Sequence, residues 1–194
     1  MHVAIRTDAA VNIGSGHVFR SLVLAAAFRD QGVVTSFLCR TQEGDLCSFI
    51  ETLGYSVHRL PCTETAANSE TAWEQDAAQC RLAIEASGTR PDWIVVDHYG
   101  LDYRWERSLR TLAEHVFVID DLANRRHDCD VLLDQNFNSP LHSRYAQLLP
   151  TGAKCLLGTS YALLGAAFRD RKGDDFGDGI GVKRLDPVGQ IFEY

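Results

Sequence analysis

Three features that the sequence lacks, or has little of, exclude whole classes of protein. No apolar run approaches the roughly 20 residues that a helix needs to cross a bilayer. The chain has 19 basic against 26 acidic residues, a formal net charge of −7, which argues against a nucleic-acid-binding domain because such a domain presents a basic patch. Only 5 of the 194 residues are proline while 45% are hydrophobic, which excludes a disordered or collagen-like chain. The length predicts one domain, with or without a tail.

The cysteines are too scattered to form a zinc site. No two of them make a CxxC or CxxxxC pair, and no histidine stands at zinc-finger spacing from them. The first residues, MHVAIRTDAA, contain no apolar signal core. We therefore expect a cytoplasmic protein with reduced thiols, no metal and no cofactor. The cysteines are Cys39, Cys47, Cys62, Cys80, Cys129 and Cys155.

The first forty residues predict a βαβ unit. Residues 2–6 are rich in β-forming side chains, a glycine-bearing loop follows, and apolar residues then recur near helical spacing up to Gly32, a typical helix stop. Residues 33–39 are the next strand candidate. Strand, loop, helix and strand in this order are the signature of a parallel sheet, so the predicted fold class is α/β.

The alternation of strands and helices continues along the chain. The run WIVVD, residues 93–97, is apolar on both faces, as in a central parallel strand. From residue 169 onward glycines recur and no face is consistently apolar, so we expect a domain of residues 1–168 and a glycine-rich tail of residues 169–194. Further helices are expected at residues 43–53, 70–86 and 101–113, and further strands at residues 55–60, 116–120, 130–134 and 154–158.

The segment Gly14-Ser15-Gly16-His17 follows the first strand and opens the first helix. Its glycines allow a tight turn, and unpaired N–H groups at a helix start favour an anion such as a diphosphate. His17 faces the positive end of the helix dipole, which favours a neutral ring that accepts a proton from water. The same segment is compatible with an ordinary strand-to-helix turn and with a histidine that only caps or packs.

Other polar residues stand at the carboxyl ends of predicted strands, where ligands gather in parallel α/β sheets. Asp97 ends the WIVVD strand and can orient a histidine or a sugar hydroxyl, and the nearby Tyr99 can donate a hydrogen bond. Strand-end capping and packing are the alternatives for these two. Arg6 and Asp8 end the first strand and are expected to line the same crevice, with a charged turn as the alternative.

A pair of carboxylates, Asp120 and Asp121, follows another predicted strand. Paired carboxylates serve acid–base chemistry or bind a metal. Nothing nearby completes a Mg²⁺ or Ca²⁺ site, so we expect a structural or orienting role for this pair.

Four segments occur here in the order in which they occur in one enzyme family. They are RTDAAVNIGSGHVFRSLVLA, DWIVVDHYGLD, VIDDLANRRHDCDVLLDQN and LLGTSYALL. From about Met1 to Leu164 the chain thereby resembles the UDP-2,4-diacetamido-2,4,6-trideoxy-β-L-altropyranose hydrolases of pseudaminic acid biosynthesis. The resemblance implies a Rossmann-like parallel sheet with helices on both faces, corresponding to the amino-terminal half of a GT-B fold. It also implies that His17 is the catalytic base and that Tyr99 belongs to the substrate pocket.

The implied reaction is hydrolysis of a UDP-linked diacetamido-trideoxy sugar at its anomeric carbon, with inversion and release of UDP. The expected partner is a small nucleotide sugar, not a nucleic acid or a membrane, and the oligomeric state stays open. Members of the family are longer and carry a second domain with most of the UDP site, so we expect a truncated chain. An inactive fragment and a non-catalytic binding module are the alternatives. The residues expected to bind substrate are Arg6, Asp8, Gly14, Ser15, Gly16, Asp97 and Tyr99.

Overall fold

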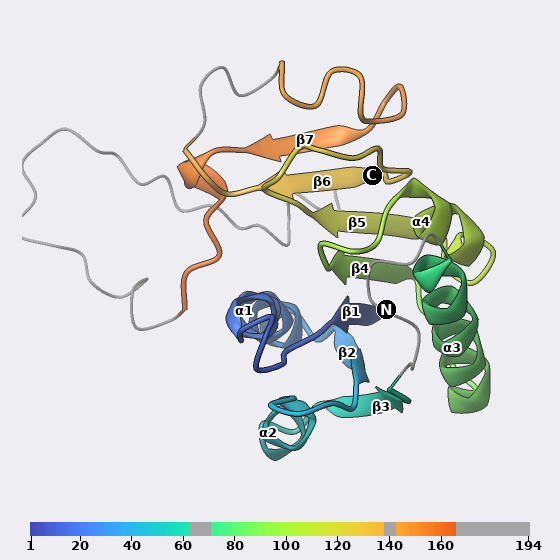
Figure 1. Cartoon of the computed structure of the whole chain (residues 1–194). Helices are drawn as coiled ribbons and strands as arrows, with labels where there is room; N and C mark the ends of the chain where they lie inside the picture. Colours follow the sequence, from blue (N-terminus) through green and yellow to red (C-terminus); the bar gives the residue numbers. More distant parts are fainter. Residues whose placement is uncertain (63–70, 138–142, 166–194) are drawn as a thin grey trace, which may run out of the picture.

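A seven-stranded parallel sheet forms the centre of the molecule (Figure 1). The computed structural model describes residues 1–62, 71–137 and 143–165; the expected tail and the domain boundary at residue 168 lie outside them. The strands are β1 (His2–Thr7), β2 (Val34–Arg40), β3 (Ser56–Leu60), β4 (Trp93–Asp97), β5 (His115–Ile119), β6 (Val131–Asp134) and β7 (Lys154–Leu157). They lie in the order β3-β2-β1-β4-β5-β6-β7, and each neighbouring pair is parallel. The predicted α/β class is confirmed.

Four α-helices occur within the described residues: α1 (Gly16–Asp30), α2 (Cys47–Thr52), α3 (Ala72–Ser87) and α4 (Tyr103–Leu109). Two of them, α2 and α4, are shorter than the sequence predicted. Gly44 has a φ of +79°, outside the helical region, and the Asp45 carboxylate accepts the backbone N–H of Cys47 at 2.9 Å, so α2 begins only there. The carboxylate of Asp102 likewise accepts the N–H two residues later at 2.9 Å and caps α4.

The two faces of the sheet are covered by different helices (Figure 1). Successive side chains of a strand point to opposite faces. On β1, Val3 and Ile5 join an apolar core with residues of α1 and α2, whereas Ala4 joins a second core with residues of α3 and α4. The predicted Rossmann-like arrangement, a parallel sheet between two layers of helices, is therefore confirmed.

The order of the strands reverses between β1 and β4. From β1 the chain moves outward through β2 to β3, and from β4 it moves outward in the other direction to β7. Ligands of open α/β sheets bind outside the carboxyl ends of the strands at such a switch point. Thr7 and Asp97, the last residues of β1 and β4, are partners in the register of this pair. The loop after β1 and the end of β4 therefore lie side by side at the carboxyl ends of the strands.

Two further observations concern the cysteines and the helices. None of the six cysteines forms a disulfide, and Cys39, Cys47, Cys80 and Cys129 are buried in the two cores as small apolar groups. Among the described residues, no helix is both long enough and apolar enough to cross a membrane.

Candidate active site

The loop between β1 and α1 presents its backbone at the surface. Gly14 has a φ of +82°, which glycine adopts without strain, and its N–H donates to the carbonyl oxygen of Ala10 at 2.8 Å. Gly14, Ser15 and Gly16 are exposed, and the Ser15 side chain makes no capping hydrogen bond. Because the first N–H groups of a helix lack intrahelical partners, this geometry leaves donors for an anion. Binding of substrate by these three residues stays a prediction.

His17 and Asp97 form a buried pair at the switch point. His17 lies in the first turn of α1 with a side chain only 8% exposed, and Asp97 at the end of β4 is fully buried. The Nδ1 atom of His17 lies 2.6 Å from Oδ1 of Asp97. This contact is the one that Asp97 needs in order to orient a histidine, and binding of substrate by Asp97 stays a prediction.

This hydrogen bond determines which ring nitrogen of His17 is free. A carboxylate only accepts hydrogen bonds, so Nδ1 carries the proton and donates it to Asp97. A guanidinium nitrogen of Arg20 also lies 3.1 Å from Nδ1, but it is closer to Oδ1 of Asp97, at 2.5 Å, and donates there. The Nε2 atom has no hydrogen-bond partner among the described residues, which leaves its lone pair available for a proton.

Arg20 is a member of the site that the sequence reasoning missed. Its Nε donates to Oδ2 of Asp97 at 2.6 Å while Nη2 donates to Oδ1, and Nη1 lies 3.3 Å from Oδ2 of Asp121. Burial alone would lower the pKa of Arg20, but the carboxylates of Asp97 and Asp121 outweigh it and raise the pKa. One signal was present in the sequence: Arg20 follows His17 by three residues, so both share one face of a helix.

Tyr99 lies against the ring of His17. The two ring centroids are 4.4 Å apart with an interplanar angle of 80°, an edge-to-face contact. Tyr99 is 44% exposed, so its ring borders the buried pair from the solvent side. Partial burial and the carboxylate of Asp121 raise the pKa of its hydroxyl, which stays a donor near neutral pH. A hydrogen bond from Tyr99 to substrate stays a prediction.

Arg6 and Asp8 lie elsewhere than expected. Arg6 is fully buried, its Nη1 contacts Asp8 at 2.6 Å, and its Nη2 contacts Asp76 of α3 at 2.6 Å. Asp8, 2% exposed, also accepts the backbone N–H of Arg40 at 2.7 Å. Arg6 points to the same face of β1 as Ala4, toward α3, because side chains alternate along a strand. The expectation that these two side chains line an open crevice is therefore corrected: they form a buried ionic network beneath the loop.

The network shifts the acidity of its carboxylates. Burial would raise the pKa of Asp76, but the charges of Arg6 and Arg40 and a hydrogen bond from Arg6 outweigh it and hold the pKa far below the usual value. Arg6 holds the pKa of Asp8 well below the usual range in the same way. Asp76 also accepts the indole N–H of Trp105 at 2.9 Å, which ties α4 to α3.

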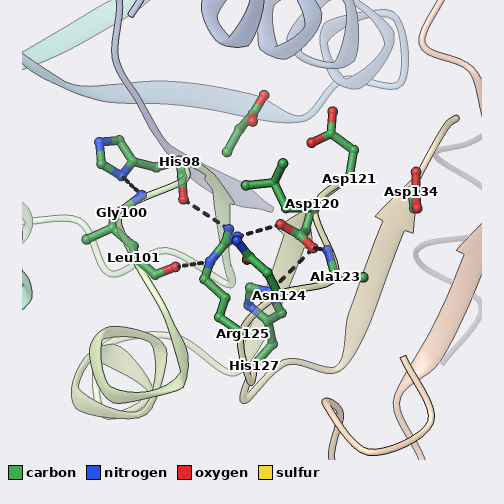
Figure 2. Close-up of polar contacts among 12 residues, drawn as sticks. His98, Gly100, Leu101, Asp120, Asp121, Ala123, Asn124, Arg125, His127 and Asp134 are labelled. Carbon is green, nitrogen blue, oxygen red and sulfur yellow. Dashed lines mark hydrogen bonds and ion pairs between the residues drawn. The ribbon is translucent and has the colours of Figure 1, made fainter. Parts of the chain in front are cut away.

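The adjacent carboxylates Asp120 and Asp121 point to different partners. Asp121 contacts Arg20, whereas Asp120 is fully buried and lies 2.7 Å from Nη1 of Arg125. Figure 2 shows Arg125 between this carboxylate and the carbonyl oxygens of His98 and Leu101, to which it also donates. Residues 1–62, 71–137 and 143–165 contain no group of three or more histidine, cysteine or acidic side chains arranged to hold a metal. Each of the two carboxylates is paired with an arginine.

A curated protein of Campylobacter jejuni, a UDP-2,4-diacetamido-2,4,6-trideoxy-beta-L-altropyranose hydrolase, is 30% identical over 183 residues. This chain resembles that hydrolase over 91% of its own length. The resemblance carried by the four sequence segments is thereby confirmed. The chain spans 59% of the length of this curated relative.

Two other comparisons have lower sequence identity and cover less of the chain. An uncharacterized protein of Methanocaldococcus jannaschii is 25% identical over 121 residues, which make up 62% of this chain and 22% of that protein. The crystal structure of Acinetobacter baumannii MurG has a TM-score of 0.48 and 16% sequence identity, covering 63% of this chain and 34% of MurG. No protein-family model matches the chain.

Proposed function

We propose that this chain carries the catalytic base of a hydrolase that acts on a UDP-linked 2,4-diacetamido-2,4,6-trideoxy sugar in pseudaminic acid biosynthesis. Water attacks the anomeric carbon, the configuration there is inverted, and UDP leaves. The observation that carries the proposal is the hydrogen bond from Nδ1 of His17 to Asp97, which leaves Nε2 as a proton acceptor. Similarity to the Campylobacter hydrolase supports the substrate class.

In this mechanism His17 takes a proton from the attacking water at Nε2. Asp97 holds the ring by Nδ1 and stabilises the imidazolium that forms. UDP is a good leaving group, so a strong general acid is less necessary than in ordinary glycoside hydrolysis. The chemistry then needs only the base and donors for the diphosphate.

We assign the remaining predicted residues to two positions around the proposed reaction. The exposed N–H groups of the loop Gly14-Ser15-Gly16 supply donors for the diphosphate, and Tyr99 borders the sugar. Arg6 and Asp8 do not contact the substrate in this proposal; their buried ion pair stabilises the start of the loop. The correspondence of this domain to one half of a GT-B fold and a cytoplasmic location belong to the same proposal.

The test is release of UDP from the UDP-linked sugar by the wild-type chain and by His17→Gln. Loss of about 10²–10⁴ in kcat is expected, the usual contribution of a general base. The matched control is His58→Gln, because His58 lies on the edge strand β3 and makes no contact with His17. Equal turnover by His17→Gln and the wild type would overturn the base assignment.

A binding module without turnover, or an inactive fragment, is the second candidate, as the sequence left open. Here the wild-type chain would release no UDP from a substrate that the full-length relative hydrolyses. Calorimetry with UDP then separates the two forms of this candidate. Micromolar binding indicates a binding module, whereas absence of binding indicates an inactive fragment.

A further inference from the structure

Arg20 lies one turn after His17 on α1 and binds the same carboxylate, that of Asp97. The Nε and Nη2 atoms of Arg20 lie 2.6 and 2.5 Å from the two oxygens of Asp97, a two-pronged contact. The Arg20 side chain is 12% exposed and Asp97 is fully buried. A planar guanidinium fork sets the plane of the carboxylate that it holds, which a lysine ammonium does not do.

Asp97 needs such a partner. A buried carboxylate without a counter-charge is costly. The other donors to Asp97, the ring of His17 and the hydroxyl of Ser21 at 3.5 Å, are neutral and do not compensate for its charge. With both oxygens engaged by Arg20, the carboxylate turns Oδ1 toward Nδ1 of His17 at 2.6 Å. The orientation of the base thus depends on Arg20 through Asp97.

The remaining guanidinium nitrogen of Arg20, Nη1, contacts a residue that follows another strand. Its Nη1 lies 3.3 Å from Oδ2 of Asp121, which follows β5 by two residues. The guanidinium therefore joins the first helix, the end of β4 and the segment after β5 around one histidine. With Nε, Nη1 and Nη2 all directed at carboxylates, the cation is engaged by the protein itself rather than held out toward a ligand.

We propose that Arg20 is a positioning residue: it fixes Asp97 so that the proton of His17 stays on Nδ1 and Nε2 faces the reacting water. The proposal rests on the function assigned above to His17. It implies that loss of the guanidinium fork changes the tautomer of His17 and lowers kcat while substrate binding is retained. A residue that bound the diphosphate directly would instead raise KM.

The first experiment reads the tautomer without any substrate. The ¹⁵N chemical shifts of His17 are measured in the wild-type chain, in Arg20→Gln and in Arg20→Lys. We expect the wild type to hold the proton on Nδ1 and both variants to move toward the Nε2-protonated form that a free imidazole prefers. The control is Arg29→Gln, since Arg29 is on the same helix but bonds the carbonyl oxygen of Leu53. Arg20→Lys keeps the charge in place if Arg20→Gln does not fold.

The second experiment is kinetic and uses the same variants. Arg20→Lys is expected to lower kcat about 10-fold or more with KM changed by less than about 2-fold, because the base is misaligned while the substrate contacts remain. An unchanged His17 tautomer in both Arg20 variants overturns the positioning role. A raised KM with unchanged kcat overturns it in favour of direct contact with the substrate.

The two proposals fail in different ways. If His17→Gln keeps full turnover while the Arg20 variants still shift the tautomer, the function of His17 is wrong and the positioning of its ring stands. If His17→Gln abolishes turnover while Arg20→Lys alters neither tautomer nor kcat, the base assignment stands and the role of Arg20 is wrong.

Discussion

The Nδ1 atom of His17 lies 2.6 Å from Oδ1 of Asp97, although 80 positions separate the two residues in the chain. They meet because His17 follows β1, Asp97 ends β4, and these strands are neighbours where the strand order reverses. The protonation of the proposed base therefore depends on a residue contributed by another strand.

Replacing Asp97 with asparagine tests this dependence. The amide presents a donor to Nδ1 in place of an acceptor, so the proton of His17 moves to Nε2 and the base is blocked. We expect kcat for UDP release to fall about 10²–10⁴-fold with little change in KM. The control is Asp102→Asn, because asparagine caps a helix as well as aspartate and Asp102 lies at the start of α4. Full activity in Asp97→Asn would show that the tautomer does not matter.

Replacing Asp76 with asparagine tests the buried network below the loop. Arg6 and Arg40 both lie 2.6 Å from Oδ2 of Asp76, and Arg6 has no exposed surface. Removing the shared carboxylate leaves buried positive charge, so we expect a loss of about 3–5 kcal/mol in the free energy of unfolding. Urea denaturation followed by circular dichroism measures it. Glu51→Gln, which breaks an exposed pair with Arg59, should leave the midpoint almost unchanged.

Two glycines of the same loop form a matched pair for a stability test. Gly14 has a φ of +82°, whereas Gly16 is the first residue of α1, and a Cβ at either position would meet no atom within 4 Å. Gly14→Ala is expected to cost about 1–2 kcal/mol because of backbone strain alone. Gly16→Ala is expected to be neutral or slightly stabilising, because alanine is the better helix former. Equal midpoints of thermal unfolding would contradict the left-handed turn at Gly14.

Acid should destabilise the protein through its buried carboxylates. Asp8, Asp76 and Asp120 have pKa values held far below the usual 3.8, since nearby cations and hydrogen bonds outweigh their burial. A lowered pKa in the folded state means that the stabilisation is present above pH 3.8 and is lost as the pH falls below it. We expect the free energy of unfolding, measured in urea between pH 6 and about pH 3, to drop steeply at the acid end. The drop should be smaller in Asp76→Asn.

His127 should have the opposite dependence on pH. Its Nδ1 lies 2.7 Å from Oε1 of Glu106 and its Nε2 3.8 Å from Oδ2 of Asp120, with all three side chains buried. Burial would lower the pKa of His127, but these two carboxylates outweigh it and raise the pKa above 6.5. The stabilisation is therefore complete below pH 6.5 and is lost as the pH rises through the folded-state value. In His127→Gln, unfolding measured between pH 6 and about pH 9 should lack this decline.

Much of the fold was predictable because local patterns specify it. Residues 93–97 are apolar on both faces, which is what a central parallel strand requires, and β4 lies in the middle of the sheet. The first residues of α2 and α4 were predicted less well, because the turn at Gly44 and the cap at Asp102 delay the start of each helix within a run of apolar periodicity.

The sequence alone determined that polar residues would end the strands β1, β4 and β5 and that a histidine would open the first helix. Only the tertiary structure decided which of those side chains meet. Arg6 contacts Asp76 because its side chain lies on the face of β1 that α3 covers. Arg20 contacts Asp97 and Asp121 because β4 and the segment after β5 bring these carboxylates to α1, beside His17. The partner of a charged side chain depends on strand order and register, and long-range packing sets both.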